Sequence, residues 1–550
     1  MKTSAKRLLS VLLVLLLLLS CTSASFAAGR KTEAEKTPIV LIPGFGQSET
    51  AVYDNDGTYL GNINSFVLPG LNDTGAILKK VLGPVLASAA TKMDVGLTDA
   101  VEGVMDDIFK PYSLNDDGTP VYNKVVDYYG DAFSNLPPEA QQIVQHHISI
   151  HGLEEYNDVR YYFTYDTFGS IKEAGDGLHD YIHNVVLKQT GAKQVTLVPV
   201  SQGATVLTQY LADYPEDYPL FKKIISMIPA FDGAQILGDI MTDNVKIYDI
   251  NYDHETVLPQ LIGGDLGYQI SLALRFALSE RQLKKVLAAA LEKARQKLVV
   301  NSTSMWALVP AADYAKVKEH FLCDGRHDKI FAECEAYDAA RRALPATLHK
   351  LKDDGVSIQI VCCYGTGNTF PYLFGSGNLN SDDLLTPASA SLGATYANLG
   401  ETLGDDYVCK GTHCKNKAHN HLSPDRMIDA STCEFPENTW FFKNVKHREA
   451  NLRNDLKDFA AQLILRDDIQ DIYTYPGYEG KQFIDPKDAV AHTIDGKNAN
   501  GETIRYYYDK DWHFLYSEVE PEPETFSVWK LFATLTNKIF RAFEPLKIFA

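Results

Sequence analysis

Short apolar segments recur along the chain, separated by longer stretches in which apolar residues have helical spacing. The apolar segments are residues 38–42, 159–165, 195–199, 224–228, 358–365 and 439–442. Several of them lack strict alternation of apolar and polar positions, which is typical of strands that are buried on both faces. The pattern predicts an α/β fold: a mainly parallel sheet flanked by helices and joined by right-handed crossovers.

Changes in this pattern divide the chain into parts. Apolar residues between 283 and 298 form one helical stripe, so residues 251–355 are predicted to be a helical cap or lid inserted between core strands. The other predicted parts are a first core part at 37–250 with an insertion at about 48–155, a second core part at 356–468, and a C-terminal extension at 469–550.

Segments at both ends of the chain bear on where in or outside the cell the protein is found. Positive residues followed by an apolar segment at 8–19 and small residues at 25–27 predict a signal peptide at 1–27 and a secreted or cell-surface protein. As a helix this apolar segment would span only about 18 Å, short of a bilayer core of roughly 30 Å. Cys21 is an alternative lipoprotein attachment site. In the extension, residues 528–543 form an amphipathic helical pattern that either contacts lipid or packs on the protein's own core.

Charge and cysteine content narrow the class of protein. A formal charge of −19 argues against nucleic acid as a partner. No cofactor is predicted. Cys323 with Cys334 and Cys409 with Cys414 are predicted as disulfides in an oxidising compartment. The segment 409–421 holds two Cys and three His and is alternatively a metal site, but its spacing matches no tight zinc pattern, so no metal is predicted.

The stretch VPVSQGA, residues 198–204, places Ser201 between a predicted strand and a predicted helix. It is either the strained turn that presents a nucleophile or an ordinary strand-to-helix turn. A nucleophile turn needs little bulk two residues to either side of the serine. Gly203 meets this need, and Pro199 has a fixed φ that suits the last residue of a strand.

Serine catalysis also needs a base, a carboxylate that orients the base, and hydrogen-bond donors for the oxyanion. His447 follows the strand at 439–442, and Asp382 and Asp383 lie in the loop after the strand at 358–365. Both aspartates are candidates at this point. The Gly-rich turn after the strand at 38–42 supplies the Phe45 N–H as one oxyanion donor, with the Gln202 N–H as the other.

These stretches resemble the α/β-hydrolases of lipase type, in particular the lecithin:cholesterol acyltransferase-like lipases and esterases. The similar stretches are PIVLIPGFGQS, YFTYDTFGSIKEAGDGLHDYI, VTLVPVSQGATVLTQYL, SMWALVPAADYAKVKEHFL, SDDLLTPASASLG and TWFFKNVKH. Departures are Pro199 and Val200 for Gly and His beside the serine, and Pro43 for His before the oxyanion glycine. In the family's Asp-Gly pattern, Asp382 takes the place of the aspartate and Asp383 that of the glycine.

The resemblance implies a serine hydrolase that cleaves carboxylic esters of lipid-like substrates through an acyl-enzyme. It assigns Ser201 as nucleophile, His447 as base and Asp382 as the residue that orients the base. An acyltransferase with the same residues is an alternative, and so is a catalytically inactive hydrolase fold that binds lipid or a partner protein. A membrane or lipid interface is expected as a partner of the lipase, of the acyltransferase or of the inactive lipid-binding protein.

Overall fold

The computed structural model describes most of the chain between residues 36 and 519. The described residues are 36–63, 74–147, 152–246, 264–368, 373–414, 416, 418–450, 453–497, 503–510 and 514–519. The predicted signal peptide, Cys21 and the amphipathic segment at 528–543 lie outside these residues and stay predictions.

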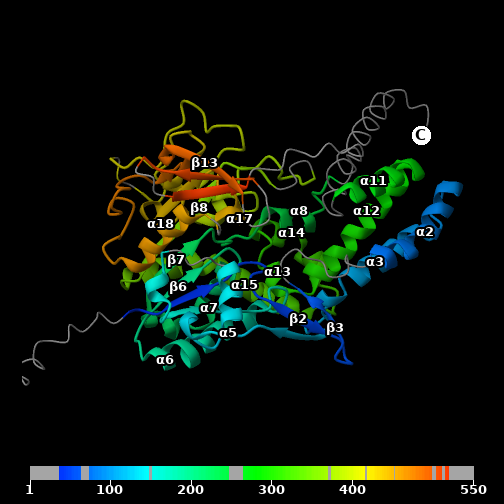
Figure 1. Cartoon of the computed structure of the whole chain (residues 1–550), viewed down its shortest axis with the longest axis horizontal. Coiled ribbons are helices and arrows are strands. Elements are labelled where there is room, and N and C mark those ends of the chain that lie inside the picture. Colours follow the sequence, from blue (N-terminus) through cyan, green and yellow to red (C-terminus); the bar gives the residue numbers. More distant parts are fainter. Residues whose placement is uncertain are drawn as a thin grey trace, which may run out of the picture.

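The main sheet has seven parallel strands in the order β12-β11-β8-β7-β6-β1-β5 (Figure 1). They are β1 (Ile39–Ile42), β5 (Arg160–Tyr162), β6 (Val195–Pro199), β7 (Phe221–Met227), β8 (Ser357–Tyr364), β11 (Thr439–Lys443) and β12 (Phe483–Ile484). Each predicted strand segment overlaps one of them, and β6 has the predicted bounds. The predicted α/β fold is therefore confirmed.

Hydrophobic cores lie on both faces of this sheet, because successive strand residues point to opposite sides. In β1, Val40 and Ile42 belong to one core and Ile39 and Leu41 to the other. The first core is covered by α5 (Ile171–Tyr181), α7 (Gly203–Asp213) and α15 (Asp328–Asp353), the second by α4 (Pro138–His147) and α18 (Asn454–Leu465). Burial on both faces explains the continuous apolar runs in the sequence.

Four helices form a group to one side of the sheet (Figure 1). They are α2 (Thr74–Thr91) and α3 (Leu97–Ile108) from the predicted insertion at 48–155, and α11 (Gly264–Ala277) and α12 (Glu280–Arg295) from the predicted cap. The Gln282 amide in α12 donates to the carbonyls of Ser88 and Met93, both at 3.0 Å, and α12 packs along α3. The two inserted regions therefore pack against each other.

The rest of the predicted cap range has two different roles. The short helices α13 (Thr303–Trp306) and α14 (Ala311–Leu322) share a hydrophobic cluster with the first residues after β7. In contrast, α15 packs on α7 and on the sheet, where it buries Tyr337, Leu344, Leu348 and Leu351. The range 251–355 thus contains α15, which packs on the main sheet, in addition to helices that do not pack on this sheet.

Smaller elements complete the described part of the chain. Three antiparallel sheets have the orders β3-β2-β4, β10-β9 and β13-β14-β15. Their strands are β2 (Thr50–Tyr53), β3 (Tyr59–Asn62), β4 (Asn123–Val126), β9 (Thr395–Tyr396), β10 (Ile428–Asp429), β13 (His492–Lys497), β14 (Thr503–Tyr508) and β15 (Phe514–Val519); the short helices are α6 (Lys188–Thr190), α8 (Gln235–Met241), α16 (Pro387–Ser391) and α17 (His447–Ala450). Among the described helices, none combines the length and apolar character needed to span a bilayer.

Candidate active site

Ser201 lies in a sharp turn between β6 and α7. Strand β6 ends at Pro199, and the next residue, Val200, donates its N–H to the Ile42 carbonyl of β1 at 2.9 Å. Ser201 itself has φ of 51°, in the left-handed region that costs a non-glycine residue roughly 1–2 kcal/mol. Helix α7 begins two residues later. The sequence Val-Pro-Val-Ser-Gln-Gly therefore forms a strained strand-to-helix turn, with the proline as the last residue of its strand.

Two glycines allow this turn to pack closely against the end of β1. A Cβ atom on Gly203 would lie 2.2 Å from the Ile42 carbonyl oxygen and 2.8 Å from that of Pro43. A Cβ atom on Gly44 would lie 2.8 Å from the Ser201 Cβ. Distances below 3 Å to backbone atoms cannot be relieved by side-chain rotation. The Pro-Gly-Phe-Gly turn and the Ser201 turn therefore touch, and larger residues are excluded where they meet.

Ser201, His447 and Asp382 form one continuous hydrogen-bonded chain. The Ser201 Oγ and the His447 Nε2 are 2.8 Å apart, and the His447 Nδ1 and the Asp382 Oδ2 are 2.7 Å apart. The residues follow β6, β11 and β8, whose parallel arrangement brings their carboxyl ends to one edge of the sheet. The structure thus brings together the three side chains singled out in the sequence, although they are 65 and 246 positions apart along it.

Both oxygens of the Asp382 carboxylate take part in hydrogen bonds. Its Oδ1 accepts hydrogen bonds from the backbone N–H groups of Leu384 (3.1 Å) and Leu385 (2.7 Å), which leaves Oδ2 for His447. The side chain is 1% exposed. The two leucine amides were not foreseen in the sequence, because a backbone donor carries no side-chain signal. They fix the carboxylate in the orientation that His447 requires.

Asp383, the competing acid, has a different conformation. Its φ is 82°, the left-handed conformation that glycine favours. Burial, followed by the neighbouring Asp382 charge, raises the pKa of Asp383 to about 6. Among the described hydrogen bonds, the one at the His447 ring nitrogen Nδ1 joins it to Asp382.

The pKa of His447 results from two opposing effects. Burial of the ring lowers it, but the charge of Asp382 and its hydrogen bond outweigh burial, so the pKa of His447 lies above the usual 6.5. A protonated His447 cannot accept the Ser201 proton. The neutral, competent form is therefore populated as the pH rises through this raised pKa.

We expect the value of kcat/KM for ester hydrolysis to rise with pH, with a midpoint above about 6.5. Exchange of Asp382 for asparagine leaves burial as the dominant effect and should move the midpoint of the residual activity to lower pH. The measurement is kcat/KM for a soluble ester between about pH 5 and about pH 9. Since Asp383 titrates nearby, the profile of Asp383→Asn serves as control; a wild-type midpoint below about 6 contradicts the expectation.

The two predicted oxyanion donors belong to the two turns that meet at Ser201. The Gln202 N–H lies at the start of α7, directly after the serine, and has no hydrogen-bond acceptor within the described part of the chain. Phe45 follows Gly44 in the turn that packs against Ser201, and the centroids of the Phe45 and Phe168 rings are 5.2 Å apart in an edge-on arrangement. The role of the two amides as oxyanion donors stays a prediction.

The Gln202 side chain joins the Ser201 turn to two other segments. Its Nε2 donates to the carbonyls of Thr167 (3.2 Å) and Ser304 (3.4 Å). Thr167 follows β5 and Ser304 belongs to α13. These contacts hold helix α13 close to the Ser201 turn.

The two predicted disulfides are wrong for the described residues. Cys323, Cys334, Cys409 and Cys414 are all free thiols. Cys323 is exposed whereas Cys334 is buried. The Cys409 thiol donates to the Asp429 carboxylate at 3.0 Å, while the Cys414 sulfur faces His419 and Glu437. Proximity in sequence did not bring the sulfur atoms together, because the side chains have separate partners.

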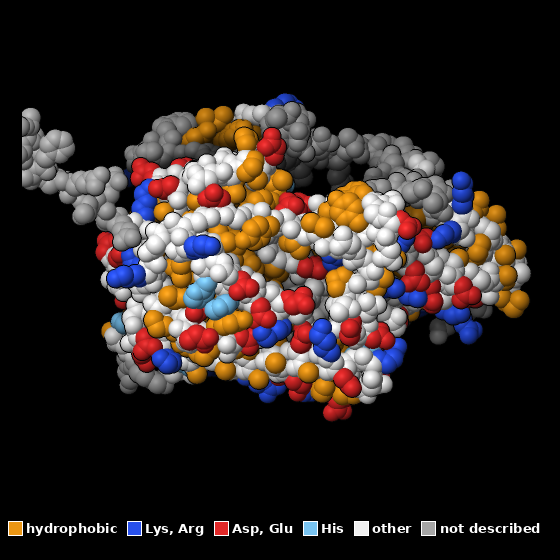
Figure 2. All heavy atoms as spheres, turned by 90° about the horizontal axis from the view of Figure 1, so that it is seen from below, with side chains coloured by type: hydrophobic (Ala, Val, Ile, Leu, Met, Phe, Trp, Pro, Cys, Tyr) orange, Lys and Arg blue, Asp and Glu red, His pale blue; other side chains and the backbone are white. Residues whose placement is uncertain are grey.

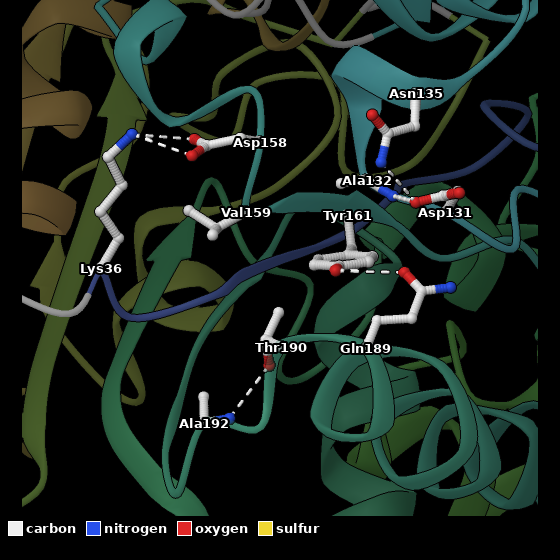
Figure 3. A pocket seen from close by; sticks show the side chains of 10 residues that line it. All are labelled: Lys36, Asp131, Ala132, Asn135, Asp158, Val159, Tyr161, Gln189, Thr190 and Ala192. Carbon is white, nitrogen blue, oxygen red and sulfur yellow. Dashed lines mark hydrogen bonds and ion pairs between the residues drawn. The ribbon is translucent and has the colours of Figure 1, made fainter.

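A separate open pocket of about 650 Å³ lies at the opposite edge of the sheet (Figure 3). Its lining residues include Lys36 before β1, residues 158–159 before β5 and residues 189–192 before β6, and Lys36 forms an ion pair with Asp158 at 2.9 Å. Tyr161 donates to Gln189 across it at 3.2 Å. None of its lining residues belongs to the Ser201 cluster, so it is not part of the candidate active site.

Comparison with known proteins gives little guidance. No family model and no curated protein matches the chain. Among solved structures, a chain from "The crystal structure of Tle4-Tli4 complex" is similar to 78% of this chain over 97% of its own length, with 11% identity and a TM-score of 0.29. A TM-score this low supports no inference.

Proposed function

We propose that the protein is a serine hydrolase of the α/β-hydrolase type that cleaves carboxylic esters, with Ser201 as nucleophile, His447 as base and Asp382 as orienting acid. The observation that carries the proposal is the hydrogen-bonded chain from Ser201 Oγ through both ring nitrogens of His447 to Asp382. The strained φ at Ser201 is a second, independent observation, since such strain persists where function requires it.

The proposed reaction uses the three side chains and two backbone amides. The Ser201 oxygen attacks the ester carbonyl while its proton passes to His447 Nε2, and Asp382 stabilises the imidazolium that forms. The carbonyl oxygen, now negative, accepts hydrogen bonds from the amides of Phe45 and Gln202. His447 then protonates the leaving alcohol, which leaves an acyl group on Ser201. Water attacks the acyl-enzyme with the same base, releases the acid and restores the serine.

A lipid-like ester is the proposed substrate class. Exposed apolar side chains support it: Leu82 and Leu86 on α2 and Phe276 on α11 are 49%, 61% and 65% exposed. Hydrophobic side chains gather at the same end of the molecule, on the right in Figure 2. An apolar surface of this kind suits contact with a lipid interface. We further propose that the protein is secreted or attached to the cell surface, on the basis of its N-terminal sequence.

A fluorophosphonate probe tests the proposed nucleophile. We expect one adduct per folded chain, located on the peptide that contains Ser201, because only an activated serine attacks such a probe at a useful rate. Chain unfolded by heat should not react, since the three residues no longer meet. An unlabelled but folded chain would favour the inactive binding protein.

Hydrolysis of p-nitrophenyl esters with short and long acyl chains tests the substrate class. A preference for long chains, increased when the ester forms an interface, supports a lipase, and a preference for short soluble esters supports an esterase. Transfer of the acyl group to an added alcohol in place of water identifies the acyltransferase, which has the same triad.

A further inference from the structure

A second cluster of reactive side chains lies away from Ser201. Cys414, His419 and His421 come from the segment 409–421, and Glu437 comes from the single-turn helix η10 (Pro436–Asn438) just before β11. One potential ligand atom from each of the four residues lies within 4.8 Å of every other. Segments that are separated in sequence thus bring a sulfur, two imidazole nitrogens and a carboxylate oxygen together.

The spacing of these atoms suits a tetrahedral metal site. With zinc bonds of about 2.3 Å to sulfur and about 2.0 Å to nitrogen or oxygen, a tetrahedron places sulfur about 3.5 Å from the other ligand atoms. The Cys414 Sγ is 3.6 Å from the His419 Nδ1 and 3.7 Å from the Glu437 Oε1. The His419 Nδ1 and Glu437 Oε1 are closer, at 2.8 Å, because they form an ion pair. Binding of a metal requires them to separate by about half an ångström.

His421 gives the second, independent indication that a ligand binds here. Its side chain is 1% exposed, and its Nδ1 is 2.8 Å from the Gln482 Oε1. The Gln482 amide nitrogen already donates to two carbonyls, those of Pro436 and Thr439, so its oxygen must face the ring. The His421 Nδ1 therefore carries the proton, and Nε2 has a lone pair. Within the described residues this buried Nε2 has no hydrogen-bond partner.

We propose that Cys414, His419, His421 and Glu437 bind one Zn²⁺ ion. Thiolate, imidazole and carboxylate are ligands that zinc accepts together in a tetrahedral site. The His421–Gln482 hydrogen bond is the outer contact that commonly orients a zinc-bound histidine. Four protein ligands leave no open coordination position, so the ion has a structural role and takes no part in ester hydrolysis.

Zinc binding changes the protonation of the cluster. The His421 Nε2 already has a lone pair, because Nδ1 donates to Gln482. A zinc-bound cysteine is a thiolate, so Cys414 must release its proton to the solvent. On His419, a metal at Nδ1 moves the ring proton to Nε2, so the exposed Asn416 amide that now donates to Nε2 has to turn. Zinc affinity therefore rises with pH.

Another cluster, formed by His179, His183 and Asp217, provides a useful contrast. His179 and His183 contact the two oxygens of the buried Asp217 at 2.8 Å and 2.9 Å, and Tyr210 donates to the same carboxylate at 2.7 Å. Here each group already has a hydrogen-bond partner, so no metal is needed to account for the arrangement. This cluster serves as the internal comparison for the Cys414 site.

Zinc and cobalt titration of the full chain tests the site. After treatment with a chelator, the wild type should bind one Zn²⁺ per chain, and Co²⁺ at this site should give a thiolate-to-cobalt charge-transfer band. Cys414→Ser and His421→Gln should weaken zinc binding more than about 100-fold, beyond the roughly 10–100-fold that loss of an outer partner costs. Cys409→Ser is the matched control: it changes a thiol in the same segment and should keep both zinc and the cobalt band.

Thiol protection in the wild type tests the site without a variant. One equivalent of Zn²⁺ should slow alkylation of Cys414 at least about tenfold, while the exposed Cys323 reacts at an unchanged rate. Unchanged alkylation of Cys414, a Cys409–Cys414 disulfide in the purified chain, or zinc binding that is lost in His179→Gln and kept in His421→Gln would each overturn the proposal. None of these results depends on whether the protein hydrolyses esters.

Discussion

Replacement of Ser201 by alanine is expected to lower kcat for ester hydrolysis by about 10⁵–10⁶-fold, because the residue that forms the acyl-enzyme is lost. The remaining histidine and oxyanion donors can assist only a direct attack by water. Among the described residues the hydroxyl makes a single hydrogen bond, to His447, so the melting temperature should stay within a few degrees of the wild type. Initial rates with p-nitrophenyl esters and thermal melting measure the two effects.

The control for this variant is Ser134→Ala, which removes an exposed hydroxyl whose one hydrogen bond in the described part of the chain is to the Asn135 side chain. It should leave both kcat and the melting temperature unchanged. If Ser201→Ala keeps more than about one hundredth of wild-type activity while folded, the nucleophile is a different residue and the proposed triad is wrong.

Replacement of Asp382 by asparagine is expected to lower kcat by about 10⁴-fold. The Leu384 and Leu385 amides hold an acceptor oxygen at the Oδ1 position, so the new NH₂ group must face His447. This group donates to Nδ1 and forces the ring proton onto Nε2, the atom that has to accept the serine proton. The loss thus comes from the wrong tautomer of His447, with the fold intact.

Asp383→Asn is the matched control for this loss. Asparagine tolerates the left-handed φ of 82° better than most residues, and the side chain does not contact the His447 ring in the structure. We expect kcat to stay within about threefold of the wild type. If Asp383→Asn were the variant with the large loss and Asp382→Asn the mild one, the assignment of the acid would have to be reversed.

The strands were predictable because they are buried on both faces. Residues 195–199 have the same bounds in sequence and structure, since all five residues are buried and both ends of the segment are apolar. β12 was missed, because two residues, Phe483 and Ile484, are too few for any periodicity to appear. Its place in the sheet is determined by pairing with β11, a tertiary contact.

The candidate triad could be found from its order along the chain, but its acid could not be chosen by spacing alone. Asp382 and Asp383 are adjacent, and the choice depends on backbone conformation: φ is 82° at Asp383, and Asp382 directs its carboxylate to His447. For the cysteines, the order along the chain led to a wrong prediction. Closeness in sequence predicted a Cys409–Cys414 disulfide, whereas the partner Glu437 lies 23 residues beyond Cys414 and could not be linked to it from the sequence.

Strand β12 has a consequence for any shortened form of the protein. It pairs with β11 through Phe441 and Phe442, and the Gln482 carbonyl just before it accepts the Phe441 N–H at 2.9 Å. A chain that stopped ahead of residue 482 would turn β11 into an edge strand with open backbone donors and acceptors. Such edges recruit strands from other molecules and promote aggregation. Deletion of the C-terminal region would therefore expose a strand edge close to His447 and lower the solubility of the protein. Fusion partners and tags should be attached after this strand.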